Sequence, residues 1–203
     1  MNAFLRLVRL PLVPTAVADT WAGWFLAGGG SDPAALALLA AFSAFAYAFG
    51  MALNDISDGF RDATEHPRRP LPVGAVSATA ARTLALALLW GAIAASAAIV
   101  WRAPPDPLRF ATETRIGSAA TLLALIWIYD TRHALRAAAG PWMLGACRAL
   151  NLVFGAAAAM GAAEWPFFME QPRALAAALL LGGYVAVLTR VSGREATDPR
   201  AAG

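Results

Sequence analysis

One short stretch sets the character of this chain: Asn54-Asp55-Ile56-Ser57-Asp58-Gly59-Phe60-Arg61-Asp62, at the end of a long apolar run. On a helix of about 3.6 residues per turn, Asn54, Asp58 and Asp62 form an i, i+4, i+8 row, and Asp55 lies beside it. Carboxylates crowded on one face repel one another unless a cation sits among them. Their oxygen atoms suit Mg²⁺, which often bridges carboxylates to a phosphate. The pattern therefore predicts a metal and diphosphate site at the end of an apolar helix.

The composition is typical of a membrane protein. Of the 203 residues, 59% are hydrophobic and only 14% are charged, and the mean hydropathy is +0.56. Soluble domains carry about 25% charged residues. The net charge of +3 is small and indicates no nucleic-acid partner, so we expect none. The one cysteine, Cys147, excludes an internal disulfide and a multi-cysteine metal site, and two histidines are too few for a histidine-rich centre.

Six apolar segments predict an all-α, polytopic transmembrane bundle. They cover roughly residues 7–26, 33–53, 83–101, 116–129, 141–162 and 174–189. The fourth segment is short, and residues 110–114 can extend it as an interfacial turn. This domain is predicted to span residues 1–195, and a polar tail follows over residues 196–203.

The N-terminus resembles a signal peptide, because Arg6 and Arg9 precede an apolar stretch. Pro11 and Pro14 interrupt that stretch, however, and apolarity then resumes. The pattern favours a first helix that is retained in the mature protein.

The distribution of arginines predicts the orientation in the cytoplasmic (inner) membrane. With both termini inside, eleven arginines fall in cytoplasmic segments and four on the opposite side, as the positive-inside rule requires. The eleven are Arg6, Arg9, Arg61, Arg68, Arg69, Arg82, Arg132, Arg136, Arg190, Arg194 and Arg200. This orientation places the acidic stretch and the segment after Tyr129 on the same, cytoplasmic face.

A proline-rich loop follows the acidic stretch: His66-Pro67-Arg68-Arg69-Pro70-Leu71-Pro72. Its prolines end the helix and stiffen the chain. Arg68 and Arg69 follow the predicted metal site closely enough to bind a phosphate there, because a planar guanidinium donates hydrogen bonds in pairs. They are equally compatible with a solvated cytoplasmic loop.

A second polar segment, Tyr129-Asp130-Thr131-Arg132-His133-Ala134-Leu135-Arg136, follows the fourth apolar run. Asp130 is its only carboxylate and, taken alone, is compatible with an ordinary helix end. Its predicted position on the same face as the first stretch makes it a candidate site residue.

Polar residues also lie inside apolar helices. Asp19 lies in the first, and Arg148 and Asn151, three residues apart, share a face of the fifth. A buried charge there costs at least about 2.5 kcal/mol and normally has a partner. Asp19 and Arg148 either form a structural pair or both line a polar cavity, and we favour the cavity.

These residues resemble a known family, the UbiA-type intramembrane prenyltransferases. The first Asp-rich motif of that family resembles Asn54-Asp55-x-x-Asp58-x-x-x-Asp62 with the later Arg69-Pro70-Leu71-Pro72, and the start of its second motif resembles Tyr129-Asp130. An EboC-like branch of the family resembles Gly140-Pro141-x-Met143-x-Gly145-x-x-Arg148-x-x-Asn151, together with Asp19. The resemblance covers about residues 1–195.

The resemblance implies an enzyme that ionises a prenyl diphosphate with Mg²⁺ and transfers the prenyl group to an aromatic or other lipophilic acceptor. It implies catalytic roles for four carboxylates: Asp55, Asp58, Asp62 and Asp130. It implies that the metal is held by the same four and by Asn54. It implies substrate contacts from Asn54, Arg68, Arg69, Arg148, Asn151 and Asp19.

Two features depart from the family pattern. Ala134 stands where the second motif usually carries another acidic residue. The family usually has nine transmembrane helices, and six are predicted here, so the last three are lacking. These departures predict weak or absent activity for the 203-residue chain, and possible self-association.

Two alternatives stay open. A catalytically impaired UbiA-like protein would act as a carrier or scaffold in a membrane. A CDP-alcohol phosphotransferase is less favoured: Asp55-x-x-Asp58-Gly59 resembles the opening of its motif, but Gly74 is not followed by the two aspartates that the motif needs.

Overall fold

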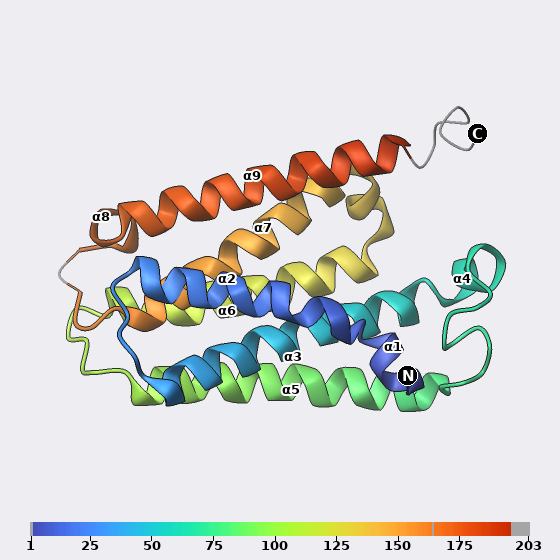
Figure 1. Cartoon of the computed structure of the whole chain (residues 1–203), viewed down its shortest axis with the longest axis horizontal. Helices are drawn as coiled ribbons and strands as arrows, with labels where there is room; N and C mark the ends of the chain where they lie inside the picture. Colours follow the sequence, from blue (N-terminus) through green and yellow to red (C-terminus); the bar gives the residue numbers. More distant parts are fainter. Residues whose placement is uncertain (1, 164, 196–203) are drawn as a thin grey trace.

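The computed structural model describes residues 2–163 and 165–195, and within these ranges the chain forms helices and turns without a β-strand. The elements are α1 (Ala3–Leu7), the 3₁₀ helix η1 (Leu10–Leu12), α2 (Val13–Leu26), α3 (Pro33–Ser57), α4 (Gly59–Glu65), α5 (Ala78–Arg102), α6 (Phe110–Thr131), α7 (His133–Ala159), α8 (Phe167–Glu170) and α9 (Pro172–Glu195) (Figure 1). The predicted all-α class is confirmed. The predicted polar tail, residues 196–203, lies outside the described residues.

Four helices, α3, α5, α7 and α9, are long and apolar enough to cross a membrane. The chain is therefore an integral membrane protein. Two further helices, α2 and α6, coincide with the first and fourth predicted segments. However, α2 has only 14 residues, and α6 carries Glu113, Arg115 and Asp130. The described residues thus contain four candidate spans, and six spans remain a prediction.

The first predicted helix, residues 7–26, is wrong as one continuous element. The chain forms α1, then η1, then α2, and Arg9 between the first two adopts a left-handed backbone with φ 48° and ψ 49°. The two prolines of this segment explain the break. Pro11 has no N–H to donate to a preceding turn, and Pro14 fits the first turn of α2, where no such donor is needed.

The predicted start of the fifth segment at Pro141 is also wrong. Helix α7 begins at His133, directly after a single non-helical residue, Arg132, and it contains Pro141 in its interior. A proline there removes one backbone hydrogen bond, which membrane helices tolerate when neighbouring groups compensate. The segment after Tyr129 is thus helical except at Arg132.

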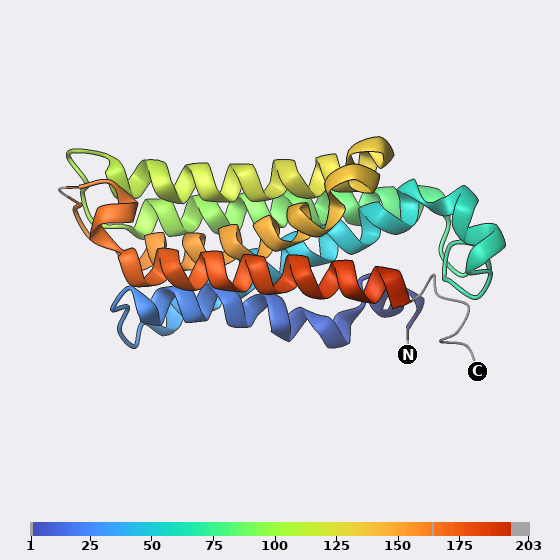
Figure 2. The same ribbon diagram turned by 90° about the horizontal axis from the view of Figure 1, so that it is seen from above.

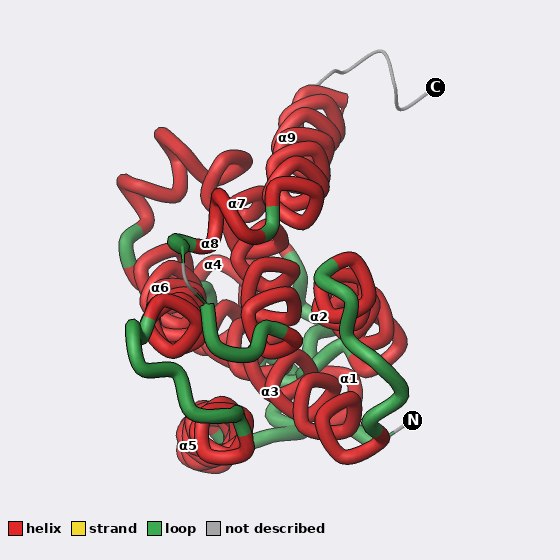
Figure 3. Tube along the Cα trace, turned by 90° about the vertical axis from the view of Figure 1, so that its left-hand side faces the viewer, coloured by secondary structure: helices red, strands yellow, loops and turns green. Residues whose placement is uncertain are grey.

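Helices α3 and α7 form the centre of the bundle. Helix α3 packs against α2, α5 and α6, and α7 packs against α2, α6 and α9. Helices α5 and α9 lie at opposite edges (Figures 1 and 3) and are the least buried of the four candidate spans. Between the central helices, the rings of Phe42 and Phe154 lie 4.2 Å apart at their centroids, and both are fully buried.

Small residues let α2 and α9 approach α7 closely. A Cβ at Gly155 would collide with the backbone of Thr20, and one at Gly145 would collide with the backbone of Gly182. Such contacts are characteristic of membrane helices, where close van der Waals packing replaces a hydrophobic driving force. They fix α2 and α9 against α7.

The two polar segments lie at one end of the bundle. The N-terminal helix α1, the helix α4 with its following loop, and the turn between α6 and α7 share that end (Figures 1 and 2). The prediction that the acidic stretch and Asp130 lie on the same face is thereby confirmed. At the opposite end, Asp32 caps α3 by accepting hydrogen bonds from the backbone N–H groups of Ala34 and Ala35.

Candidate functional site

An amide joins the two polar segments. Nδ2 of Asn54, near the end of α3, donates to Oδ2 of Asp58 at 3.2 Å and to Oδ1 of Asp130, in the last turn of α6, at 3.1 Å. Asp130 is buried, and Asp58 is largely so. Two carboxylates from distant parts of the sequence therefore meet at one side chain, as predicted from their shared face.

The predicted row of Asn54, Asp58 and Asp62 on one helix is only partly correct. Helix α3 ends at Ser57, and Asp58 is the residue between it and α4. Asp62 belongs to α4, and its carboxylate is bound by Nη1 of Arg69 at 2.5 Å. The break separates Asp62 from Asn54, so the acidic residues form two groups rather than one line.

The second group consists of Asp55 and Asp62, which share Arg69. Its Nη1 lies 3.5 Å from Asp55 and 2.5 Å from Asp62, and Arg9 lies 3.6 Å from Asp55. Both carboxylates are buried, whereas the two arginines are partly exposed. Arg69 thus neutralises the acidic stretch from which it is separated by only a short loop.

Arg136 is a site residue that the sequence argument missed. It donates from Nη1 and Nη2 to the two carboxylate oxygens of Asp58, at 3.0 and 2.6 Å, and its guanidinium lies 5.7 Å from the centre of the Tyr129 ring. His133 lies 3.8 Å from the same carboxylate. The available signal was the spacing of His133 and Arg136, which are three residues apart and therefore share a face of α7.

An apolar cavity of about 310 Å³ leads away from Asn54 and Asp130 into the bundle. Its walls come mainly from apolar side chains, among them Leu122, Ile126 and Leu144. Tyr129 and Arg9 also line it near the polar end, and Arg148 and Asn151 line it deeper along α7. The cavity therefore has a carboxylate-bearing end and an apolar interior.

Asp19 and Arg148 form the structural pair, and the favoured alternative, in which both line a cavity, holds only for Arg148, because Asp19 is not among the residues that line either cavity. Nε of Arg148 lies 2.7 Å from Oδ2 of Asp19, and its Nη2 donates to the backbone oxygen of Thr15 at 2.8 Å. Asn151 donates to the Ala16 backbone oxygen at 2.8 Å and to Oγ of Ser43 at 2.7 Å. The pair is structural, and Arg148 also lines the cavity.

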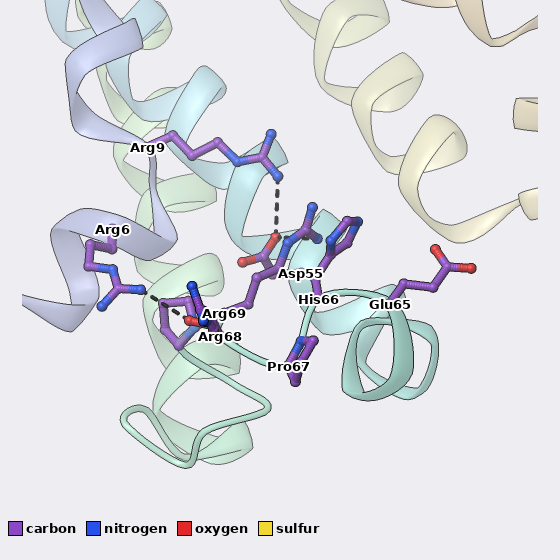
Figure 4. A pocket seen from close by; sticks show the side chains of 9 residues that line it. Arg6, Arg9, Asp55, Glu65, His66, Pro67, Arg68 and Arg69 are labelled. Carbon is purple, nitrogen blue, oxygen red and sulfur yellow. Dashed lines mark hydrogen bonds and ion pairs between the residues drawn. The ribbon is translucent and has the colours of Figure 1, made fainter. Parts of the chain in front are cut away.

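A second cavity, of about 440 Å³, lies between the N-terminal segment and the loop after α4 (Figure 4). We call it the basic pocket; it is lined by Arg6, Arg9, Asp55, Glu65, His66, Pro67, Arg68, Arg69 and Pro70. Arg68 and Arg69, predicted to contact phosphate, line this pocket and not the apolar cavity.

The donor chemistry around Asn54 fits Mg²⁺. Carboxylate and amide oxygens are the ligands this ion prefers, and three side chains that offer them meet at the cavity end. Within the described residues, however, no group of three or more His, Cys, Asp or Glu side chains is arranged to hold a metal. Arginines neutralise Asp55, Asp58 and Asp62 instead.

Comparison with known proteins agrees with the fold and with the family that the sequence resembles. The model of the UbiA prenyltransferase family matches residues 12–201. Digeranylgeranylglyceryl phosphate synthase of Natronomonas pharaonis is 37% identical over 103 residues, which are 51% of this chain and 37% of that protein. The enzyme of the same name from Ignicoccus hospitalis is 42% identical over 89 residues, which are 44% of this chain and 29% of that protein.

Solved structures share the fold over most of this chain. One, described for digeranylgeranylglyceryl phosphate synthase in membranes, has a TM-score of 0.69 at 19% identity and covers 91% of this chain and 57% of its own. A UbiA homolog from Archaeoglobus fulgidus bound to GPP and Mg²⁺ has a TM-score of 0.63 at 19% identity, and the match covers 92% of this chain and 66% of that chain. The matches thus span about a third of the curated relatives and under two thirds of these solved chains. Since the family model matches nearly the whole chain, this protein belongs to the UbiA prenyltransferase family.

Proposed function

We propose that this protein transfers a prenyl group from a prenyl diphosphate to a lipophilic acceptor, with Mg²⁺ as the cofactor. The observation that carries the proposal is the apolar cavity with Asn54 and Asp130, contributed by two different helices, at its polar end. A prenyl chain needs apolar walls, and a diphosphate needs a cation at one end of them. The related structure bound to GPP and Mg²⁺ supports the same pairing of ligands.

The reaction breaks the bond between the allylic carbon and the diphosphate oxygen, and the electron pair leaves with the diphosphate. A nucleophilic atom of the acceptor then bonds to the allylic carbon and loses a proton. Bound Mg²⁺ would neutralise the charge that develops on the leaving group. Asn54, Asp58 and Asp130 would hold it, with Asp55 and Asp62 beside them.

The side chains of the cavity have distinct roles in this proposal. Leu122, Ile126 and Leu144 exclude water, which would otherwise capture an allylic cation. Arg136 offers two parallel N–H donors, the geometry that binds a phosphate oxygen pair well. The arginine distribution of the sequence supports a cytoplasmic position for the polar end.

The acceptor is lipophilic because it has to reach the reacting carbon through an apolar environment. The curated relatives are digeranylgeranylglyceryl phosphate synthases, and the matched regions cover only part of them. Their name makes a glyceryl phosphate lipid one candidate acceptor for this chain.

The test compares Asp58→Asn with Asp32→Asn in protein reconstituted into nanodiscs. We expect Asp58→Asn to reduce Mg²⁺-dependent diphosphate release from GPP by about a hundredfold or more, because it removes a charged ligand. Asp32→Asn is the matched control, since Asn also caps a helix well and Asp32 lies at the other end of the bundle. Full turnover by Asp58→Asn, or by the wild type in excess EDTA, would contradict the proposal.

A second candidate function is that of a carrier or scaffold that binds a prenyl diphosphate without converting it. The bidentate pair between Arg136 and Asp58 favours it, because that pair occupies a carboxylate that a metal needs. Under this alternative, GPP binds in the presence of Mg²⁺ but no diphosphate is released with any lipophilic acceptor.

A further inference from the structure

Both carboxylate oxygens of Asp58 are occupied by donors from other parts of the fold. Oδ1 accepts a hydrogen bond from Nη2 of Arg136 at 2.6 Å, and Oδ2 accepts from Nη1 of Arg136 at 3.0 Å and from Nδ2 of Asn54 at 3.2 Å. His133 lies 3.8 Å from Oδ1. The side chains of Asp58 and Arg136 are only 13% and 16% exposed, so little water competes for the pair. The proposed metal ligand is thus already bound to an internal cation.

A metal ion and Arg136 compete for this carboxylate. The paired guanidinium engages both oxygens, and a divalent cation beside it would meet a like charge at close range. The amide of Asn54 presents its N–H donors, and not its oxygen, to Asp58 and Asp130, so it has to turn before it can bind a metal. Both observations agree with the lack of a preformed metal group among the described residues.

A diphosphate offers Arg136 a replacement for the carboxylate. A guanidinium donates paired hydrogen bonds to phosphate oxygens as well as to a carboxylate. The Arg136 guanidinium also lies 5.7 Å from the centre of the Tyr129 ring, within the range in which an aromatic ring stabilises a cation. Tyr129 lines the apolar cavity together with Asn54 and Asp130. The ring therefore keeps Arg136 near the polar end of the cavity once Asp58 releases it.

We propose that Arg136 is an internal counter-ion, which Asp58 exchanges for Mg²⁺ when the diphosphate binds. The guanidinium passes from the carboxylate to the diphosphate oxygens, and the freed carboxylate becomes available to the metal. This inference rests on the proposed prenyl transfer and adds to it a regulation of the same site, because the metal and the diphosphate each bind weakly alone and more tightly together. Such reciprocal coupling between two ligands typically amounts to about 5–150-fold in affinity.

The first measurement is the binding of Mn²⁺ to the protein in nanodiscs of zwitterionic lipid, without diphosphate, by electron paramagnetic resonance of the free ion. Mn²⁺ stands in for Mg²⁺ as the probe. Because Arg136→Gln removes the internal cation, we expect this variant to bind Mn²⁺ about tenfold more tightly than the wild type. Equal affinities of the two proteins would overturn the inference.

Arg132→Gln is the matched control for this measurement. Arg132 lies four residues before Arg136, is exposed and makes no ion pair within the described residues. We expect its Mn²⁺ affinity to stay within about twofold of the wild type. A tenfold gain in this variant as well would show that removal of any nearby positive charge has the same effect, and it would contradict a specific role for Arg136.

The second measurement is the binding of geranyl thiolodiphosphate, an analogue whose bridging sulfur slows cleavage, by calorimetry in excess EDTA. Asp58→Asn releases Arg136, so we expect this variant to bind the metal-free analogue about fivefold more tightly than the wild type. The gain should disappear when Arg136→Gln is added, because the gain requires the guanidinium. A gain that persists in the double variant would show general repulsion by the Asp58 carboxylate and would refute the exchange. So would the absence of any gain in Asp58→Asn.

Arg136→Lys keeps the inference testable if Arg136→Gln does not fold. Lysine retains the positive charge but replaces the paired donors by a single ammonium group. We therefore expect a Mn²⁺ affinity about threefold above that of the wild type. An affinity equal to that of the wild type would overturn the inference.

These outcomes are distinguishable from a failure of the proposed function. If the wild type releases no diphosphate from GPP with any lipophilic acceptor, prenyl transfer is refuted. The two binding measurements involve no turnover, so they still decide whether Asp58 exchanges Arg136 for a metal.

Discussion

The substitution Arg148→Met tests the pair at the centre of the bundle. It leaves Asp19, which is only 6% exposed, without its counter-ion, and it removes the hydrogen bond from Arg148 to the backbone oxygen of Thr15. Methionine keeps most of the side-chain volume, so the loss of charge dominates over the loss of packing.

The expected magnitude follows from burial. Removing one partner of a fully buried ion pair costs about 3–5 kcal/mol in soluble proteins. Single hydrogen bonds between membrane helices average about 0.6 kcal/mol and reach about 1.7. Because the Arg148 side chain is 26% exposed and lines a cavity, we expect a loss of about 2 kcal/mol, between these values.

The assay is reversible unfolding in mixed micelles, followed by tryptophan fluorescence, for a double-mutant cycle. Asp19→Asn combined with Arg148→Met removes both charges, so we expect the double variant to recover about half of the loss or more. Arg82→Met is the control, as an exposed arginine without an ion pair in the described residues. A single variant within about 0.5 kcal/mol of the wild type, or strictly additive effects, would refute the argument.

Three further substitutions probe the frame of the site. Arg115 is fully buried and donates to the backbone oxygen of Ala157 at 2.9 Å. The substitution Arg115→Met should lower the free energy of unfolding by about 2 kcal/mol in the same assay. An unchanged free energy of unfolding would show that this carbonyl needs no donor. The substitution Gly155→Leu should prevent α2 from packing on α7 at Thr20, so we expect the variant to aggregate in size-exclusion chromatography. A monodisperse variant with the wild-type melting temperature would contradict the close packing. For Asp106, burial alone would raise the pKa, but two backbone N–H donors and the nearby Arg115 outweigh it and hold the pKa below its usual value. Because the pKa of Asp106 is lower in the folded protein, its carboxylate stabilises the fold above about pH 3.9, and this stabilisation is lost as the pH falls through the folded pKa. The substitution Asp106→Asn should therefore flatten the decline of the melting temperature below about pH 4. An unchanged decline would exclude this carboxylate as its cause.

Much of this protein follows from its sequence alone. The apolar runs predicted an all-helical membrane protein because a chain in lipid has to satisfy its backbone hydrogen bonds within each segment. The positions of Asn54, Asp58 and Asp130 predicted that two distant segments meet, because alternate ends of antiparallel helices return to the same side of a bundle. The start of the second segment at residue 33 was predicted correctly, and the structure shows that Asp32 caps it. The start of the fifth segment was predicted wrongly at Pro141, because tertiary packing tolerates within a helix a residue that usually begins one.

The tertiary structure alone decided which charges meet. The sequence showed three carboxylates in the acidic stretch and many arginines, but the pairing of Asp58 with Arg136, 78 residues away, depends on where α7 begins and how it crosses α3. The placement of Arg9 between two cavities likewise depends on a left-handed turn that no local pattern required. Coulombic attraction between two charges depends on their distance in space, whereas local sequence specifies only their separation along the chain. The packing of the helices determines which charges that are far apart in the sequence lie close together in space.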